Sequence, residues 1–252
     1  MFLWSSPDAL AGQLSDRLEQ FPQWTNKPPV RAARGDLVYP EWMDGTWEVT
    51  STLVEQIAPL APKIVTPGFE KNRSYLDRPV KFEVRFAEQY LFSEMSVRPL
   101  FFLPGEQPIV ADRAFNGLEI ARAYLGDNDV LSVKVDPNNP NRQITFLAGK
   151  RLLISTVTKR GTETPATDRF VATELAQQVF RGNSQIYINQ VETTTAYQLE
   201  KPGKVVADQV TAIYLSPQDP DYFMATGRPV ALYRYQLELT SIEETASNGE
   251  QK

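Results

Sequence analysis

An alternation of large apolar and polar side chains constrains the fold of this chain more than any other feature. In residues 79–88, PVKFEVRFAE, the large side chains Val80, Phe82, Val84 and Phe86 alternate with charged residues or alanine. Successive side chains of a β-strand point to opposite faces, so a period of two predicts a half-buried strand. Comparable segments cover residues 129–136, 142–149, 151–161, 169–182, 184–200, 204–215 and 229–241.

Short polar breakers join these segments. Residues 137–141, PNNPN, predict a tight hairpin turn between 129–136 and 142–149. About nine or ten strands follow one another in this way, and sequential antiparallel strands avoid exposed edges by closing into a barrel. The sequence therefore predicts an all-β protein built on an antiparallel β-barrel, with an open sandwich as the alternative.

Helical spacing occurs in only a few places. Residues 116–126 predict one short helix, with Asn116 as its N-cap and Gly126 as its stop. A second short helix is expected at 15–21, where Pro22 ends it. The stretch TELAQQVF within 169–182 suits a helix as well as a strand, so the pattern leaves it open.

The predicted organisation is a single barrel domain with extensions at both ends. Residues 41–241 form the barrel, and the proline-bearing residues 12–40 form an extended approach that contains the first helix. Residues 242–252 are expected to be a disordered tail because they lack large apolar side chains after Ile242. Residues 1–11 end in Ala-Leu-Ala, the A-x-A pattern of an export signal, and are expected to be its remnant.

Composition excludes several kinds of function. The chain has no cysteine and no histidine, which rules out a disulfide, a Cys/His zinc site and a Ser-His-Asp triad. A net charge of −5 without a basic stripe argues against nucleic acid as a partner. No stretch of about 18 apolar residues occurs, so no membrane-spanning helix is expected. Asp219 and Asp221 are expected to serve a plain turn rather than a metal.

Gly45-Thr46-Trp47, at the start of the first long strand, resembles the G-x-W motif of lipocalins and other calycins. In that family the tryptophan covers the closed end of a ligand-binding barrel. The resemblance implies the same position for Trp47, with glycine permitting the tight entry and the indole N–H meeting a carbonyl. It also implies a barrel roomy enough for one small hydrophobic ligand, such as a pigment, a quinone or a lipid.

A second resemblance covers nearly the whole chain and concerns an uncharacterised family of cyanobacterial and plant plastid proteins. It implies a thylakoid-lumen or periplasmic location, and a cytoplasmic one if the Ala9–Ala11 pattern is fortuitous. It supplies no catalytic residue. The segments that carry it are ALAGQLSDR, VYPEWMDGTWEVTSTL, VTPGFE, ADRAFN, PNNPNR, YLSPQDPDYF and RPVALYRYQL.

Arginine and aromatic side chains supply the candidate ligand-binding residues. On a strand over 110–116, Arg113 would face away from Asp112 and could anchor an acidic ligand group through a bidentate contact. A structural salt bridge is the alternative. Trp47, Tyr197 and Tyr233 lie on the expected inner faces of strands, where they either line a ligand pocket or fill a solid barrel.

Phe101 and Phe102, in the apolar segment VRPLFFLPG, are the candidate docking residues for a membrane or protein partner. A buried strand is the alternative for this segment. Together these observations predict a non-catalytic binding protein or an accessory factor of photosynthetic membranes. The two other hypotheses are an assembly module with a filled barrel, and a chaperone resembling the bilin lyases that attach a tetrapyrrole to a client.

Overall fold

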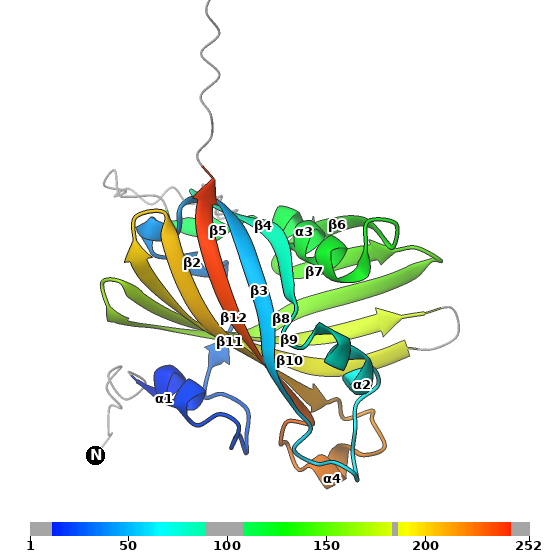
Figure 1. Ribbon diagram of the computed structural model, residues 1–252. Helices are drawn as coiled ribbons and strands as arrows, with labels where there is room; N and C mark the ends of the chain where they lie inside the picture. Colours follow the sequence, from blue (N-terminus) through cyan, green and yellow to red (C-terminus); the bar gives the residue numbers. More distant parts are fainter. Residues whose placement is uncertain (1–11, 89–107, 183–185, 243–252) are drawn as a thin grey trace, which may run out of the picture.

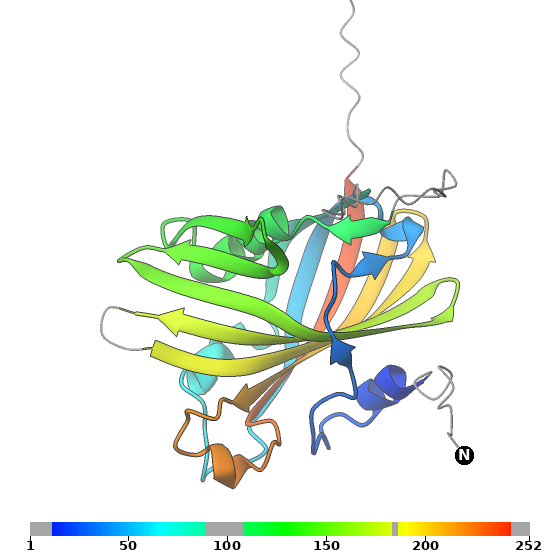
Figure 2. The same cartoon turned by 180° about the vertical axis from the view of Figure 1, so that it is seen from behind.

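One antiparallel sheet of twelve strands dominates the computed structural model, which describes residues 12–88, 108–182 and 186–242. Eleven strands follow the order β2-β5-β4-β3-β12-β11-β10-β9-β8-β7-β6, and β1 pairs with β8. The sheet curls into a half-barrel (Figures 1 and 2). The strands are β1 (Arg31–Ala32), β2 (Val38–Tyr39), β3 (Gly45–Ile57), β4 (Pro79–Glu88), β5 (Ile109–Ala111), β6 (Val130–Asp136), β7 (Asn139–Leu147), β8 (Arg151–Ala166), β9 (Arg169–Arg181), β10 (Ile186–Lys201), β11 (Lys204–Leu215) and β12 (Ala231–Ile242).

The all-β antiparallel fold class predicted from the alternation is confirmed. The eight segments with the clearest period of two, from 79–88 to 229–241, each form a strand, and β4 and β11 have the predicted bounds. Residues 169–181, which the pattern left open, are a strand paired on both sides by β8 and β10. The hairpin across residues 137–141 is confirmed as well, with a turn that begins after Asp136 and ends before Asn139.

The buried side chains of β3 lie on the concave face of the half-barrel. Trp47, Val49 and Leu53 of β3 are almost completely buried. They are spaced by two residues or multiples of two, so they share one face of the strand. Leu237 and Leu239 of the neighbouring strand β12 pack with Trp47 and Val49. The side chains of this face therefore form a largely apolar layer inside the curved sheet, which Ser51 of β3 interrupts.

The convex face is covered by the N-terminal segment, residues 12–30. Its helix α1 (Gln13–Glu19) confirms the short helix expected before Pro22. Leu14, Leu18, Phe21 and Trp24 pack against buried side chains of β9 to β12. Figures 1 and 2 show α1 on the opposite side of the sheet from the helix α3.

Helix α3 (Arg113–Leu125) packs against β4, β6 and β7 and so lies across the open side of the half-barrel (Figure 1). It corrects two sequence expectations. The strand expected over 110–116 ends at Ala111, and the N-cap is Asp112 rather than Asn116. The carboxylate Oδ1 of Asp112 accepts a hydrogen bond from the Phe115 N–H at 3.0 Å, which satisfies one of the free donors of the first helical turn. The helix ends before Gly126, as predicted.

Short helices complete the described structure: α2 (Phe69–Asn72) and α4 (Tyr222–Ala225), with single 3₁₀ turns at Glu41–Met43 and Arg73–Tyr75. None of the helices in the described ranges is both long and apolar enough to span a membrane. The expected export-signal remnant at 1–11, the docking residues Phe101 and Phe102, and the tail from residue 243 lie outside the described residues.

Candidate functional site

A cavity of about 870 Å³ lies between the concave face of the sheet and helix α3. Most of its wall is apolar and comes from the central strands and the helix. The apolar lining consists of Val49, Leu53, Phe82, Val84, Phe86, Ala111, Ile120, Leu125, Leu147, Leu153, Phe180, Leu237 and Leu239. Ligand pockets of drug-sized molecules have volumes of roughly 300–1,000 Å³ and predominantly apolar walls. The cavity has both properties.

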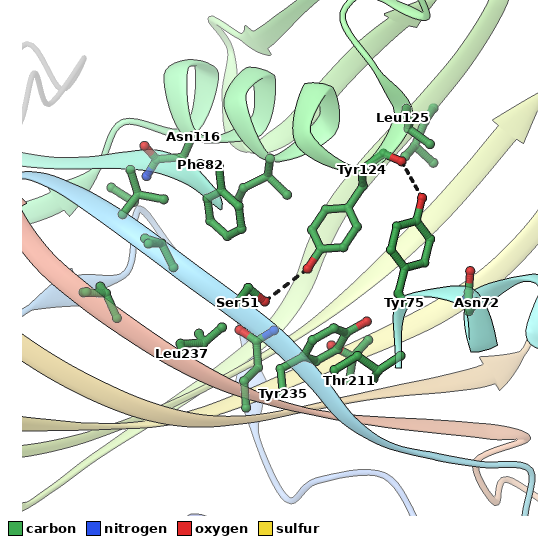
Figure 3. Close-up of a pocket in the computed structure, with 18 of the residues that line it drawn as sticks. Ser51, Asn72, Tyr75, Phe82, Asn116, Tyr124, Leu125, Thr211, Tyr235 and Leu237 are labelled. Atoms are coloured by element: carbon green, nitrogen blue, oxygen red, sulfur yellow. Dashed lines mark hydrogen bonds between the residues drawn. The ribbon is translucent and has the colours of Figure 1, made fainter. Parts of the chain in front are cut away.

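Two tyrosine hydroxyls link helix α3 to the rest of the half-barrel at this cavity. The hydroxyls of Tyr124 on α3 and Ser51 on β3 share a hydrogen bond of 3.1 Å, and the Tyr75 hydroxyl donates to the Tyr124 carbonyl at 2.8 Å (Figure 3). Burial raises the pKa of the Tyr124 phenol. These bonds tie the C-terminal half of α3 to the half-barrel and fix one wall of the cavity.

Three further polar side chains lie on the sheet side of the cavity. Tyr235 and Thr211, labelled in Figure 3, line the cavity together with Gln209, and Gln209 pairs with Tyr235 across strands β11 and β12. Gln209 Oε1 accepts a hydrogen bond from the Thr195 hydroxyl at 3.1 Å. Burial is the main cause that raises the pKa of Tyr235, so its phenol keeps its proton throughout the physiological range.

An aromatic cluster closes one end of the cavity. The ring centroids of Tyr39 and Phe86 are 4.7 Å apart, and Phe170 and Tyr197 stack with 6.3 Å between centroids. Tyr39, Phe86 and Tyr197 belong to the cavity wall. Burial raises the pKa of Tyr197 to about 12. This end of the cavity is therefore aromatic and uncharged.

A charge network lies next to the aromatic cluster. Glu174 Oε1 binds Arg113 at 2.7 Å and Arg160 at 2.6 Å, and Arg113 also binds Asp36 at 3.2 Å. Burial alone would raise the pKa of Glu174, but the two guanidinium groups outweigh it and hold that pKa below its usual value. The four side chains carry two positive and two negative charges, so the network is balanced.

The opposite end of the cavity reaches solvent. Lys71 and Leu125 are exposed there, and the side chain of Asp129 is 55% exposed. Arg151 is held in place by Asp129 Oδ1 at 3.1 Å and by the Ala148 carbonyl at 2.8 Å. These rim residues carry the only fixed charges among the described residues that line the cavity.

Of the ligand-binding residues predicted from the sequence, Tyr197 lines the cavity. Trp47 is 2% exposed, and its indole N–H donates to the Met43 carbonyl at 2.8 Å beneath the lining layer. Tyr233 is covered by Phe69, and its hydroxyl accepts a hydrogen bond from Asn72, which does line the cavity. Arg113 is the first residue of α3, bound in the charge network and outside the lining.

Four polar residues of the cavity wall were not predicted from the sequence: Ser51, Tyr75, Tyr124 and Gln209. Tyr75 lies in a 3₁₀ turn and Tyr124 in a helix. A period of two does not indicate which side chains of such elements point toward the cavity. Gln209 stands at an inward position of β11 between Ala207 and Thr211. A polar residue at an inward position was the available signal for this site.

Within the described residues, no group of three or more acidic side chains is arranged to hold a metal ion. The fold and the cavity define a class of protein: an all-β half-barrel with an internal, largely apolar cavity. The chain belongs to the family DUF6816, described as a domain of unknown function, whose model matches residues 31–243. Neither a curated protein nor a solved structure matches the chain.

Proposed function

We propose that this protein binds one small, mainly apolar molecule in the cavity beneath α3. The observation that carries the proposal is the cavity itself, about 870 Å³ of space between the concave face of the sheet and α3. Protein interiors normally leave few voids larger than a water molecule. A space of this size, lined by aromatic and aliphatic side chains, fits the burial of an apolar ligand.

The cavity also favours ligand binding over the assembly module with a filled barrel. In a filled barrel the inward side chains would meet across the interior. Here the rings of Phe82 and Tyr124 lie 6.3 Å apart between centroids. The described residues that line the rest of the cavity leave its interior open. The proposal assigns binding to the protein and no chemical step.

For the ligand and the location, we propose a pigment, a quinone or a lipid of photosynthetic membranes, bound in the thylakoid lumen or the periplasm. Support comes from the resemblance of the chain to cyanobacterial and plastid proteins and from the Ala9-Leu10-Ala11 pattern. Organic extraction of protein purified from its native host, followed by mass spectrometry, tests this part. The expected result is one stoichiometric apolar compound, and an extract without one contradicts it.

The binding proposal is tested with N-phenyl-1-naphthylamine, an uncharged apolar probe that fluoresces when it leaves water. We expect saturable binding at one site per chain. Ala111 lines the cavity, so Ala111→Phe places a ring in the ligand space and lowers the affinity by about tenfold or more. The matched control is Ala87→Phe, the same change at an exposed position of β4.

Unchanged unfolding midpoints confirm that both variants are folded. The proposal predicts that Ala87→Phe binds the probe as the unchanged protein does. Absence of saturable binding, or equal affinity of the two variants, excludes the cavity as the site.

A further inference from the structure

The polar groups inside the cavity are uncharged. The interior wall offers the hydroxyls of Ser51, Tyr124 and Tyr235 and the side chains of Gln209 and Thr211, and burial keeps the two phenols protonated. An ionised ligand group among these side chains would lose its hydration without meeting an opposite charge, which is strongly unfavourable. The interior therefore selects against charge on the ligand.

The cations nearest to the interior are already neutralised. Arg113 and Arg160 share Glu174, and Arg113 also binds Asp36. At the rim, Arg151 is paired with Asp129. Lys71 is the one lining cation without an ion pair among the described residues, and it is exposed to solvent, where a single ion pair is worth little. A ligand carboxylate would find no strong partner here.

Two neighbouring hydrogen-bond donors in the cavity wall have no acceptor among the described residues. Within the described part of the chain, neither the Tyr235 hydroxyl nor the Gln209 amide NH₂ has a hydrogen-bond partner. Neither group is completely buried. The two residues are direct cross-strand partners on β12 and β11. Thr195 donates to Gln209 Oε1 and so orients the amide. An oxygen atom of a ligand at this place would accept from both.

We propose, building on the binding function above, that the ligand is an uncharged amphiphile whose carbonyl or hydroxyl oxygen accepts hydrogen bonds from Tyr235 and Gln209. Its apolar body lies along Phe82, Val84 and Leu237 toward the aromatic end of the cavity. Unpaired donors in an apolar wall discriminate strongly, because a ligand that lacks the acceptor leaves them unsatisfied. The site thus selects a neutral oxygen-bearing compound over both a hydrocarbon and an acid.

The test is displacement of N-phenyl-1-naphthylamine by three ligands of equal chain length: dodecanol, dodecanoate and dodecane. At about pH 8 the acid is ionised, since carboxyl pKa values lie near 4. We expect dodecanol to displace the probe about tenfold better than either of the others. Dodecane competing as well as dodecanol, or dodecanoate competing better, overturns the proposal.

Two variants locate the contact. Tyr235→Phe and Gln209→Leu each remove one donor and are expected to weaken dodecanol about fivefold while leaving dodecane and the probe unchanged. Tyr233→Phe is the matched control, because Tyr233 lies outside the lining and pairs with Asn72. Equal loss in Tyr233→Phe and Tyr235→Phe contradicts the assignment. Preference for dodecanoate that disappears in Lys71→Met places an acidic headgroup at the rim instead.

The two proposals fail in different ways. If the probe does not bind, the cavity is not a ligand site, and the inference about ligand polarity falls with the binding function. If the probe binds and Ala111→Phe blocks it, the binding function stands, and the ligand series alone decides whether the occupant is neutral.

Discussion

At the scale of single residues, the most consequential contact outside the cavity is the buried pair of Arg17 and Glu192. Arg17 Nε and Nη2 bind the two carboxylate oxygens of Glu192 at 2.6 and 2.8 Å, and Tyr214 donates to Glu192 Oε2 at 2.7 Å. Arg17 is 6% exposed and Glu192 0%. The Arg17 guanidinium also lies 3.9 Å from the centre of the Trp24 ring. This pair fastens the N-terminal segment to the convex face.

Breaking that pair from one side is predicted to be far more harmful than removing it. Arg17→Met leaves the Glu192 carboxylate buried without a counter-charge and should lower the free energy of unfolding by about 3–5 kcal/mol. In the double variant Arg17→Met with Glu192→Leu, most of the loss should be recovered, because no buried charge remains. Urea unfolding of the three proteins measures both values. A double variant less stable than Arg17→Met would contradict this account.

At the scale of elements, strands could be predicted from the sequence and the start of α3 could not. A strand with one buried face repeats every two residues whatever it pairs with, which is why β4 and β11 were assigned with their true bounds. Val110, Ala111 and the residues after them continue such a pattern, yet the chain turns into a helix at Asp112. A helix N-cap depends on one local hydrogen bond, and the spacing of apolar residues along the sequence carries no information about that bond.

At Gly161 the sequence pattern fails in the opposite way, because it predicts the end of a strand where the strand continues. The sequence suggested a strand end there, but β8 continues to Ala166. A Cβ at Gly161 would lie 2.7 Å from Val30 Cγ1 of the N-terminal segment, so the glycine allows close packing rather than a turn. A contact between residues far apart in the sequence determined its role, and no local pattern contains that information.

The cap of α3 gives the prediction at this scale. Asp112→Ala removes the acceptor of the Phe115 N–H and should cost about 1 kcal/mol. Asp112→Asn keeps an equally good cap and loses only the ion pair with Arg85. The side chains of Arg85 and Asp112 are 46% and 32% exposed, so the loss of this pair should cost less stability than Asp112→Ala. Urea unfolding and hydrogen exchange of the α3 amides measure the effect. Equal stability of Asp112→Ala and the unchanged protein would show that the cap is not needed.

The pH dependence of this cap has a definite sign. Burial alone would raise the pKa of Asp112, but the Phe115 N–H and Arg85 lower it below its ordinary value. A carboxylate with a lowered folded-state pKa contributes stability above its unfolded pKa of about 4 and loses it as the pH falls further. The stability advantage of the unchanged protein over the Asp112→Asn variant should therefore shrink below about pH 4.

At the scale of the whole molecule, the arrangement of strands decides where a cavity can exist. Tyr233 and Tyr235 share a face by their spacing, and the sequence offered no reason to separate them. In the structure Phe69 of α2 covers Tyr233, while Tyr235 stands beside the cavity. That difference depends on where α2 packs against the sheet. The inner face of the strands could therefore be predicted from the sequence, and the position of the cavity on that face could not.

The packed core of this protein extends beyond the family match. The match begins at residue 31, but the cover of the convex face comes from residues 12–30, whose side chains Leu14, Leu18, Phe21 and Trp24 are buried against the sheet. Burying one large apolar side chain contributes about 1.5–3 kcal/mol. Without this segment, buried side chains of β9, β11 and β12 would face water, and Glu192 would lose Arg17.

A chain that starts at residue 31 is therefore predicted to fold poorly even though it contains the whole family match. We expect a lower urea midpoint, strong fluorescence of a hydrophobic dye such as ANS, and aggregation, because an exposed apolar face of a sheet associates with its own copies. A chain that starts at residue 12 retains the cover and is the matched control. If the two chains unfold at the same midpoint and bind the dye equally weakly, the segment is an accessory rather than part of the core. Probe binding in the soluble fraction of the shorter chain then separates the two roles: the cavity lies on the concave face, so it should keep its affinity wherever the half-barrel remains folded.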